Sequence, residues 1–223
     1  PYFLNKEYEK TIKYEDYLIM MENIFIESNR VLKGGGYLVV NFGDYFNSGN
    51  RFYHADIPAC YPASINYFKW GVEIAKMDLQ ATRIWRKQFA KMGIPFVCNK
   101  HPRPVFDYEH IWTFRKKNGM NEEIVYDRKL SQRGVIGEDW TSKADIKTHC
   151  AAFPIELPSW VLNVYSKKGD LIYDPFMGSG TTALSAIKNN RDWIGSEISS
   201  EYCNIIEERI KKAWEEKRKE KDL

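Results

Sequence analysis

A glycine-containing turn in the last quarter of the chain has the residues needed to bind a polar cofactor. The run DPFMGSGTT (174–182) follows the apolar residues 171–173 and precedes a helical pattern. Gly178 and Gly180 allow a tight turn that approaches a ligand, and the first N–H groups of the next helix point into the same space. Residues 194–197 predict a second strand that ends in the carboxylate of Glu197, a group that can bind ribose hydroxyls. Together these features indicate an adenosyl cofactor.

The turn lacks the residues that other nucleotide sites require. A P-loop has Lys and then Ser or Thr after its last glycine, but here Gly180 is followed by Thr181 and Thr182. The turn therefore has no cation for a triphosphate. A dinucleotide fingerprint needs a third glycine, and Ala183 at that position satisfies only the looser form of the motif.

The segments around the turn resemble the cofactor half of DNA amino-methyltransferases. In order, these segments are HCAAFPIELP (149–158), KGD (168–170), DPFMGSGTT (174–182), RDWIGSE (191–197) and EYC (201–203). The resemblance implies transfer of a methyl group from S-adenosylmethionine to an exocyclic amine of adenine or cytosine in double-stranded DNA. The segment order is similar to a permuted, β-class-like subgroup, in which the catalytic half precedes the cofactor half. It implies a doubly wound, mostly parallel α/β sheet of the Rossmann-like methyltransferase type.

The resemblance also implies roles for individual residues. Glu197 would bind the ribose hydroxyls, Asp174 the methionine ammonium, and the threonines after Gly180 the methionine carboxylate. The backbone of 176–180 and the element at 153–154 would border the methionine. No metal is expected. The implied cofactor-binding residues are Phe153, Pro154, Asp174, Phe176, Gly178, Ser179, Gly180, Thr181, Thr182 and Glu197.

The first residues of the chain are similar to the catalytic motif of the same family. That motif is Asp, Asn or Ser followed by Pro-Pro and an aromatic residue, and the chain opens with Pro1 and Tyr2. We interpret the opening as this motif cut through its middle, so that the chain is truncated at its N-terminus. The distance to the landmarks at 30–41 matches the family order. Pro1 and Tyr2 are the candidate catalytic residues, and Tyr2 would stack on an extruded base.

The target base and two other functions remain alternatives. Phe3 and the run at 5–9 look more like the serine form of the motif, which favours cytosine N4 over adenine N6. An Asn-Pro-Pro-Tyr form of the motif also serves methyltransferases that act on RNA or protein glutamine. A catalytically incomplete nucleic-acid-binding fragment is the remaining alternative.

Composition excludes several classes of protein. The 223 residues are 43% hydrophobic and 15% aromatic, which is typical of a globular chain. No apolar run approaches the roughly 18 to 20 residues that cross a bilayer, so we expect a cytoplasmic protein without a membrane partner. The four cysteines form no Cys-x-x-Cys pair, which argues against a zinc site or a disulfide scaffold. The net charge of +3 does not by itself indicate a nucleic-acid partner.

The elements that must position these residues follow from periodicity. Apolar spacing predicts a helix over 14–32 that ends at the glycines 34–36, a strand over 37–42, a helix over 67–92 and a strand over 108–114. Asn41 and Asp44 follow a predicted strand, so they either face the active-site cleft or form a polar turn. In the last catalytic-half strand, Tyr108 and Glu109 carry the match to the family. The mixed charges of 207–222 indicate a solvated helix.

The family layout implies four parts of the chain. These are a catalytic half (1–116), a target-recognition segment (117–148), an S-adenosylmethionine-binding half (149–210) and a charged C-terminal tail (211–223). Arg and Lys can pair with guanine edges and phosphates, and Trp can stack or wedge. The candidate DNA-binding residues are Arg51, Lys129, Arg133, Trp140 and Lys143. A cognate restriction endonuclease and a homodimer are the remaining candidate partners.

Overall fold

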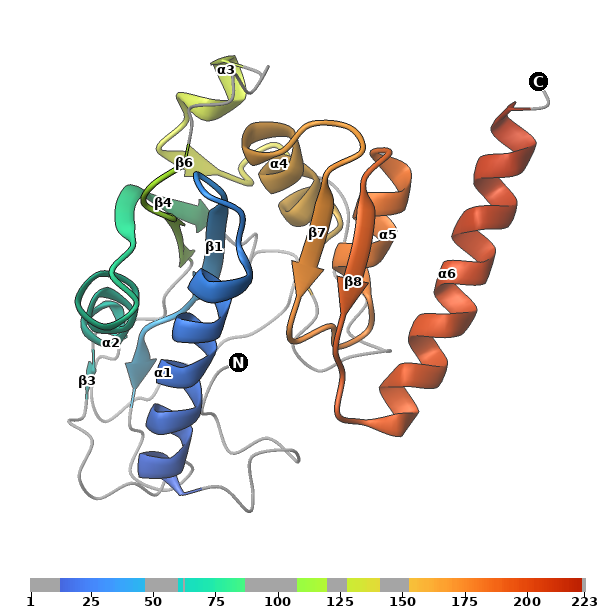
Figure 1. Ribbon diagram of the computed structural model, residues 1–223. Coiled ribbons are helices and arrows are strands. Elements are labelled where there is room, and N and C mark those ends of the chain that lie inside the picture. The colour runs from blue at the N-terminus through green and yellow to red at the C-terminus, as the bar shows by residue number, and fades with distance from the viewer. Residues whose placement is uncertain are drawn as a thin grey trace, which may run out of the picture. The chain divides into compact units, whose positions relative to one another are not determined.

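The computed structural model of the chain describes residues 13–46, 60–61, 63–86, 108–119, 128–140 and 153–221. The chain forms two compact units (Figure 1). The first contains residues 1–122 with 134–138, and the second contains 123–133 with 139–223.

The first unit holds a four-stranded sheet and the helices that cover it. Along the chain its elements are α1 (Tyr14–Val31), β1 (Tyr37–Phe42), β2 (Tyr45–Phe46), β3 (Cys60–Tyr61), α2 (Ser64–Phe68), the π-helix η2 (Lys69–Ile74), β4 (Asp78–Arg86), β5 (Tyr108–Arg115) and β6 (Val135–Ile136). The sheet order is β1-β5-β4-β6, and β2 pairs with β3 separately. Strand β5 is antiparallel to both β1 and β4, while β6 is parallel to β4.

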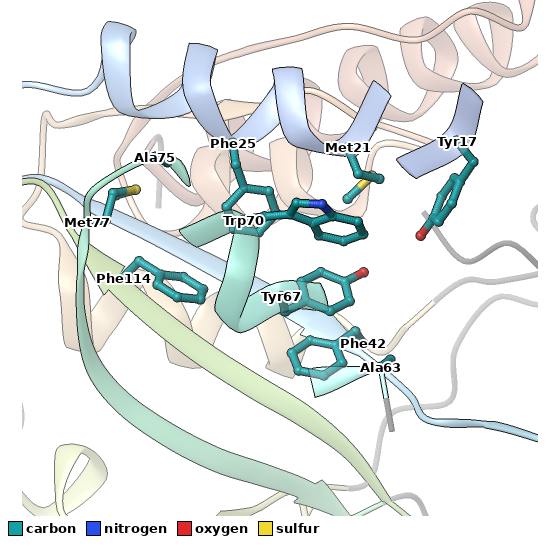
Figure 2. Close-up of a cluster of buried hydrophobic side chains, with 10 residues drawn as sticks. All are labelled: Tyr17, Met21, Phe25, Phe42, Ala63, Tyr67, Trp70, Ala75, Met77 and Phe114. Carbon is teal, nitrogen blue, oxygen red and sulfur yellow. The ribbon is translucent and has the colours of Figure 1, made fainter. Parts of the chain in front are cut away.

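The core of the first unit is aromatic and lies between α1, η2 and one face of the sheet. Figure 2 shows Phe25 of α1 approaching Trp70 of η2 and Phe114 of β5. The rings of Phe25 and Phe114 meet edge to face with centroids 5.7 Å apart, a geometry that aromatic quadrupoles favour. Gly71 is required here, because a Cβ at this position would lie 2.3 Å from Phe114 Cε1.

The start of this unit agrees with the sequence predictions. Helix α1 ends at Val31, and Gly35 takes a φ of 76° in the turn that follows, which favours glycine. The predicted strand at 37–42 is β1, and the predicted strand at 108–114 is β5. Both are confirmed.

The predicted helix over 67–92 is wrong after its first eight residues. Helical structure ends at Ile74, Lys76 adopts a φ of 56°, and residues 78–86 form β4. Strand β4 pairs with β5 along its length. These ladder hydrogen bonds and cross-strand contacts outweigh the helical preference of the local sequence. Residues 87–92 lie outside the described residues.

The second unit contains a parallel strand pair with a helix between its strands. Its elements are α3 (Arg128–Ser131), α4 (Glu156–Tyr165), β7 (Leu171–Asp174), α5 (Thr181–Lys188), β8 (Asp192–Gly195) and α6 (Ser200–Lys221). Strands β7 and β8 pair in parallel from Leu171–Asp192 to Asp174–Gly195. Helix α6 confirms the helical prediction for the charged run as far as Lys221.

A buried arginine ties the helices of the second unit to the strand β8. Arg191 donates to the carbonyl oxygens of Asn189 at 2.7 Å, Ser166 at 2.9 Å and Leu162 at 3.1 Å. These carbonyls lie at the ends of α4 and α5, where helices leave backbone acceptors unpaired. Burial lowers the pKa of the guanidinium from its ordinary value.

The α/β class is confirmed, but the expectation of a mostly parallel sheet is wrong. Among the strands that the structure describes, β1-β5, β4-β5 and β2-β3 are antiparallel, and β4-β6 and β7-β8 are parallel. Side-chain alternation predicts that a segment is a strand, but it carries little information about the direction of its neighbour.

Within the described residues, no helix has the length and apolarity that crossing a membrane requires. The same residues contain no cluster of three or more His, Cys, Asp or Glu side chains that could hold a metal ion.

Candidate functional site

The glycine turn between β7 and α5 has the strand–turn–helix form that the sequence predicts. Asp174 ends β7, and its Oδ1 accepts a hydrogen bond from the backbone N–H of Phe176 at 2.9 Å. Gly178 and Gly180 have φ values of 53° and 81°, in the left-handed region where glycine has no steric penalty. Gly180 is the N-cap of α5, and no side chain caps this end of the helix. The first N–H groups of α5 can therefore serve a ligand.

The carboxylate of Glu197 is bound directly to this turn. Its Oε2 accepts from the backbone N–H of Gly178 at 2.8 Å, and its Oε1 accepts from the N–H of Ser199 at 2.9 Å. A carboxylate has about four acceptor positions, so two remain for hydroxyl donors. The side chain is thus held in one orientation before any ligand arrives.

The ends of β7 and β8 are held in register by backbone bonds. The N–H of Ser196 donates to Asp174 O at 3.1 Å, and the N–H of Met177 donates to Ser196 O at 3.0 Å. A Cβ on Gly195 would lie 2.2 Å from Met177 Cγ, so this position needs glycine. Both carboxylates, Asp174 and Glu197, therefore sit at the carboxyl ends of two paired parallel strands, where doubly wound sheets bind ligands.

The remaining predicted cofactor residues differ in exposure. Ser179 and Thr181 are buried, so their side chains support the turn, whereas Phe176 is 38% exposed beside it. Phe153 and Pro154 lie in the same unit, immediately before α4.

Sequence reasoning missed Ile198. This side chain follows Glu197 directly and is 94% exposed. A bare isoleucine next to a ribose-binding carboxylate offers an apolar surface to a flat ligand group. Its position after the acidic end of a strand is the signal that could have found it.

Among the candidate DNA-binding residues, Arg133 has a defined partner. Its Nη1 donates to Asp139 Oδ2 at 3.1 Å and to Oδ1 at 3.3 Å. The hydrogen bond from Arg133 lowers the pKa of the Asp139 carboxyl. Lys129 is exposed on α3, and Trp140 is half-buried. Arg51, Lys143, Pro1 and Tyr2 lie outside the described residues.

A second polar cluster lies at the carboxyl end of β1 in the first unit. Asp44 Oδ2 and His110 Nε2 are 3.0 Å apart, and Asp44 Oδ1 accepts from the N–H of Ala63 at 2.9 Å. Asn41 Nδ2 donates to the buried Glu109 Oε2 at 2.8 Å. The sequence pointed to Asn41, Asp44 and Glu109 but missed His110, which belongs to β5 and is stacked on Phe42.

Comparisons with known proteins agree with one another. A family profile described as DNA methylase, of the N6/N4 methyltransferase type, matches residues 1–208. The chain is 30% identical over 226 residues to the orphan methyltransferase M.BamHII of Bacillus amyloliquefaciens, covering 92% of this chain and 85% of the relative. It is 27% identical over 241 residues to the type II methyltransferase M.MthZI of Methanothermobacter thermautotrophicus, covering 93% of this chain and 65% of that one.

Solved structures share the fold. The cytosine-N4-specific PvuII DNA methyltransferase has a TM-score of 0.68 at 23% identity, covering 94% of this chain and 76% of its own. A DNA modification methylase of Thermus thermophilus, solved in complex with S-adenosyl-L-methionine and described as a candidate of that class, has a TM-score of 0.67 at 23% identity, covering 90% of this chain and 79% of its own.

Proposed function

The chain belongs to the N6/N4 DNA methylase family, and on that premise we propose that it transfers a methyl group from S-adenosylmethionine to cytosine N4 in double-stranded DNA. The single observation that carries the cofactor assignment is the bond between Glu197 Oε2 and the N–H of Gly178. It joins the two elements that an adenosyl cofactor needs, a ribose acceptor and a glycine turn.

The second unit would bind the cofactor. Glu197 would use its two remaining acceptor positions for the ribose hydroxyls. Asp174, at the end of β7, would orient the methionine ammonium, and Phe176 and the following turn would border the methionine. The adenine ring is flat and apolar on its faces, and the exposed Ile198 offers a surface on which it would pack.

The methyl group itself would move in one displacement. The exocyclic nitrogen attacks the methyl carbon as the carbon–sulfur bond breaks, which leaves S-adenosylhomocysteine and a proton lost from the amine. The main contributions to the rate are alignment and electrostatic stabilisation. Because an amine inside the duplex cannot reach a buried methyl group, the base must be extruded, and Tyr2 would stack on it.

We propose the same division of the chain that the family order implies. Residues 1–116 would form the catalytic half, 117–148 the target-recognition segment and 149–210 the cofactor half, before the tail at 211–223. The type II name of M.MthZI supports a role beside a restriction endonuclease, whereas the orphan name of M.BamHII is a precedent for a methyltransferase that acts alone.

Nucleoside analysis tests the target. Duplex plasmid DNA is incubated with the protein and S-adenosylmethionine carrying a labelled methyl group, digested to nucleosides, and examined by mass spectrometry. We expect N4-methylcytosine, a preference supported by the residues after Tyr2 and by the specificity of the PvuII relative. Label only in N6-methyladenine would overturn the cytosine assignment and keep the family activity. A reaction with the Glu197→Ala protein controls for contaminating methylases.

A further inference from the structure

Helix α1 carries an apolar stripe on the side that faces away from its own core. Its buried residues Tyr17, Met21 and Phe25 point toward the sheet (Figure 2). On the opposite side, Ile19 is 59% exposed and Ile26 is 41% exposed. A surface helix of a globular protein normally places charged or polar residues on its outer face.

The exposed residues of α1 follow the spacing of a helix-pairing seam. Successive steps of three and four residues, as in a heptad repeat, connect Asp16, Ile19, Asn23, Ile26 and Arg30. We call these five residues the outer stripe. A shallow groove runs along it, lined by Asp16, Ile19, Met20, Asn23, Ile24 and Glu27.

The outer stripe is complementary to itself when turned end for end. At 1.5 Å per residue, Asp16 and Arg30 each lie about 10 Å from Asn23, on opposite sides. In an antiparallel pair centred on Asn23, Asp16 of one copy would face Arg30 of the other at both ends. Ile19 would lie about 6 Å from the centre and Ile26 about 4.5 Å on the other side, so the isoleucines of the two copies also meet.

Arg30 is available for such a contact. Its Nε donates to Glu27 Oε2 at 2.7 Å within the same helix, with both side chains more than half exposed. Exposed ion pairs of this kind contribute little and are easily shared with a second carboxylate. A symmetric contact that uses the same patch on both subunits is the commonest form of oligomer interface.

From these observations we propose that α1 is a homodimer interface in which the outer stripes of two copies pack antiparallel. The inference is independent of the proposed function, because it depends only on α1. A single pair of four-turn helices is smaller than the roughly 1,200 to 2,000 Å² of a standard stable interface. We therefore expect a reversible dimer that forms in the micromolar range.

Sedimentation velocity of the full chain over a concentration series tests the proposal. The expected result is a shift from the 26.2 kDa monomer toward twice that mass as concentration rises to about 100 µM. Ile19→Glu should abolish the shift. Ile65→Glu is the matched control, because Ile65 is 57% exposed on α2, away from the stripe. Thermal melts of all variants confirm that they fold.

Charge reversal tests the antiparallel register. Asp16→Arg and Arg30→Asp should each weaken the dimer at least tenfold, since like charges then meet at both ends. Mixing the two variants should restore dimerisation, because both end pairs again join opposite charges in the mixed dimer. Failure of the mixture to associate would overturn the register. A wild-type monomer at every concentration would overturn the dimer and leave the stripe to another partner.

Discussion

The carboxylate of Glu197 lies 2.8 Å from the backbone nitrogen of Gly178, so the ribose-binding candidate and the glycine turn form one hydrogen-bonded unit. Glu197→Ala removes this acceptor and the one that serves Ser199. We expect the affinity for S-adenosylmethionine to fall about tenfold or more, because hydrogen bonds to charged groups contribute roughly 1.5 to 3 kcal/mol each. Isothermal titration calorimetry measures the change.

The control for this variant removes a nearby charge that has no proposed contact. Glu201→Ala takes away an exposed carboxylate from the first turn of α6. Equal affinity losses in the two variants would mean that Glu197 acts only through its charge. An unchanged affinity in Glu197→Ala would remove Glu197 from the cofactor site.

Gly195→Ala should destabilise the second unit. The added Cβ would lie 2.2 Å from Met177 Cγ and 3.0 Å from the backbone oxygen of Asp174. Met177 is buried and the backbone cannot yield cheaply, so overpacking should cost about 1 to 3 kcal/mol. Urea unfolding measures the loss.

Gly134→Ala is the matched control for this prediction. A Cβ there meets nothing within 4 Å, and Gly134 does not have a positive φ. We expect a change within about 0.5 kcal/mol. A stability loss as large as that of Gly195→Ala would show that the clash with Met177 is not the cause.

The local sequence predicts the site better than the sheet. Glycines at 178 and 180 predict the turn because only a few backbone geometries suit them, and both indeed have positive φ. Strand β4 was missed, since its strand conformation depends on pairing with β5, more than twenty residues further on. His110 was missed for the same reason, because it meets Asp44 only after the chain returns through β5.

Thr113→Val should stabilise the first unit. Thr113 is fully buried in the central strand β5, and within the described part of the chain its Oγ1 has no hydrogen-bond partner. Valine has the same shape without the hydroxyl, so its introduction should raise the free energy of unfolding by about 1 kcal/mol. Thr113→Ser keeps the hydroxyl and loses the methyl group, and it should destabilise the protein. A stability loss on substitution by valine would mean that the hydroxyl is satisfied.

The contact between Asp44 and His110 should appear as a coupling energy. Asp44 also accepts from the N–H of Ala63, so Asp44→Ala should cost more than His110→Ala. A double-mutant cycle measured by urea unfolding isolates the pair, and we expect a coupling of about 0.5 to 3 kcal/mol. Additive losses would show that the two side chains do not interact.

Arg133→Gln should weaken DNA binding in a salt-dependent way, provided that Arg133 contacts a phosphate. Each neutralised phosphate contributes about 0.9 to the slope of log K against log salt, so the slope should fall by about one. Asp139→Asn is the control, because it releases Arg133 from its acidic partner and keeps the cation. We expect this control to bind DNA at least as tightly as the parent. Fluorescence anisotropy with a labelled duplex over a salt series gives both slopes, and an unchanged slope in Arg133→Gln would exclude Arg133 from the phosphate contacts.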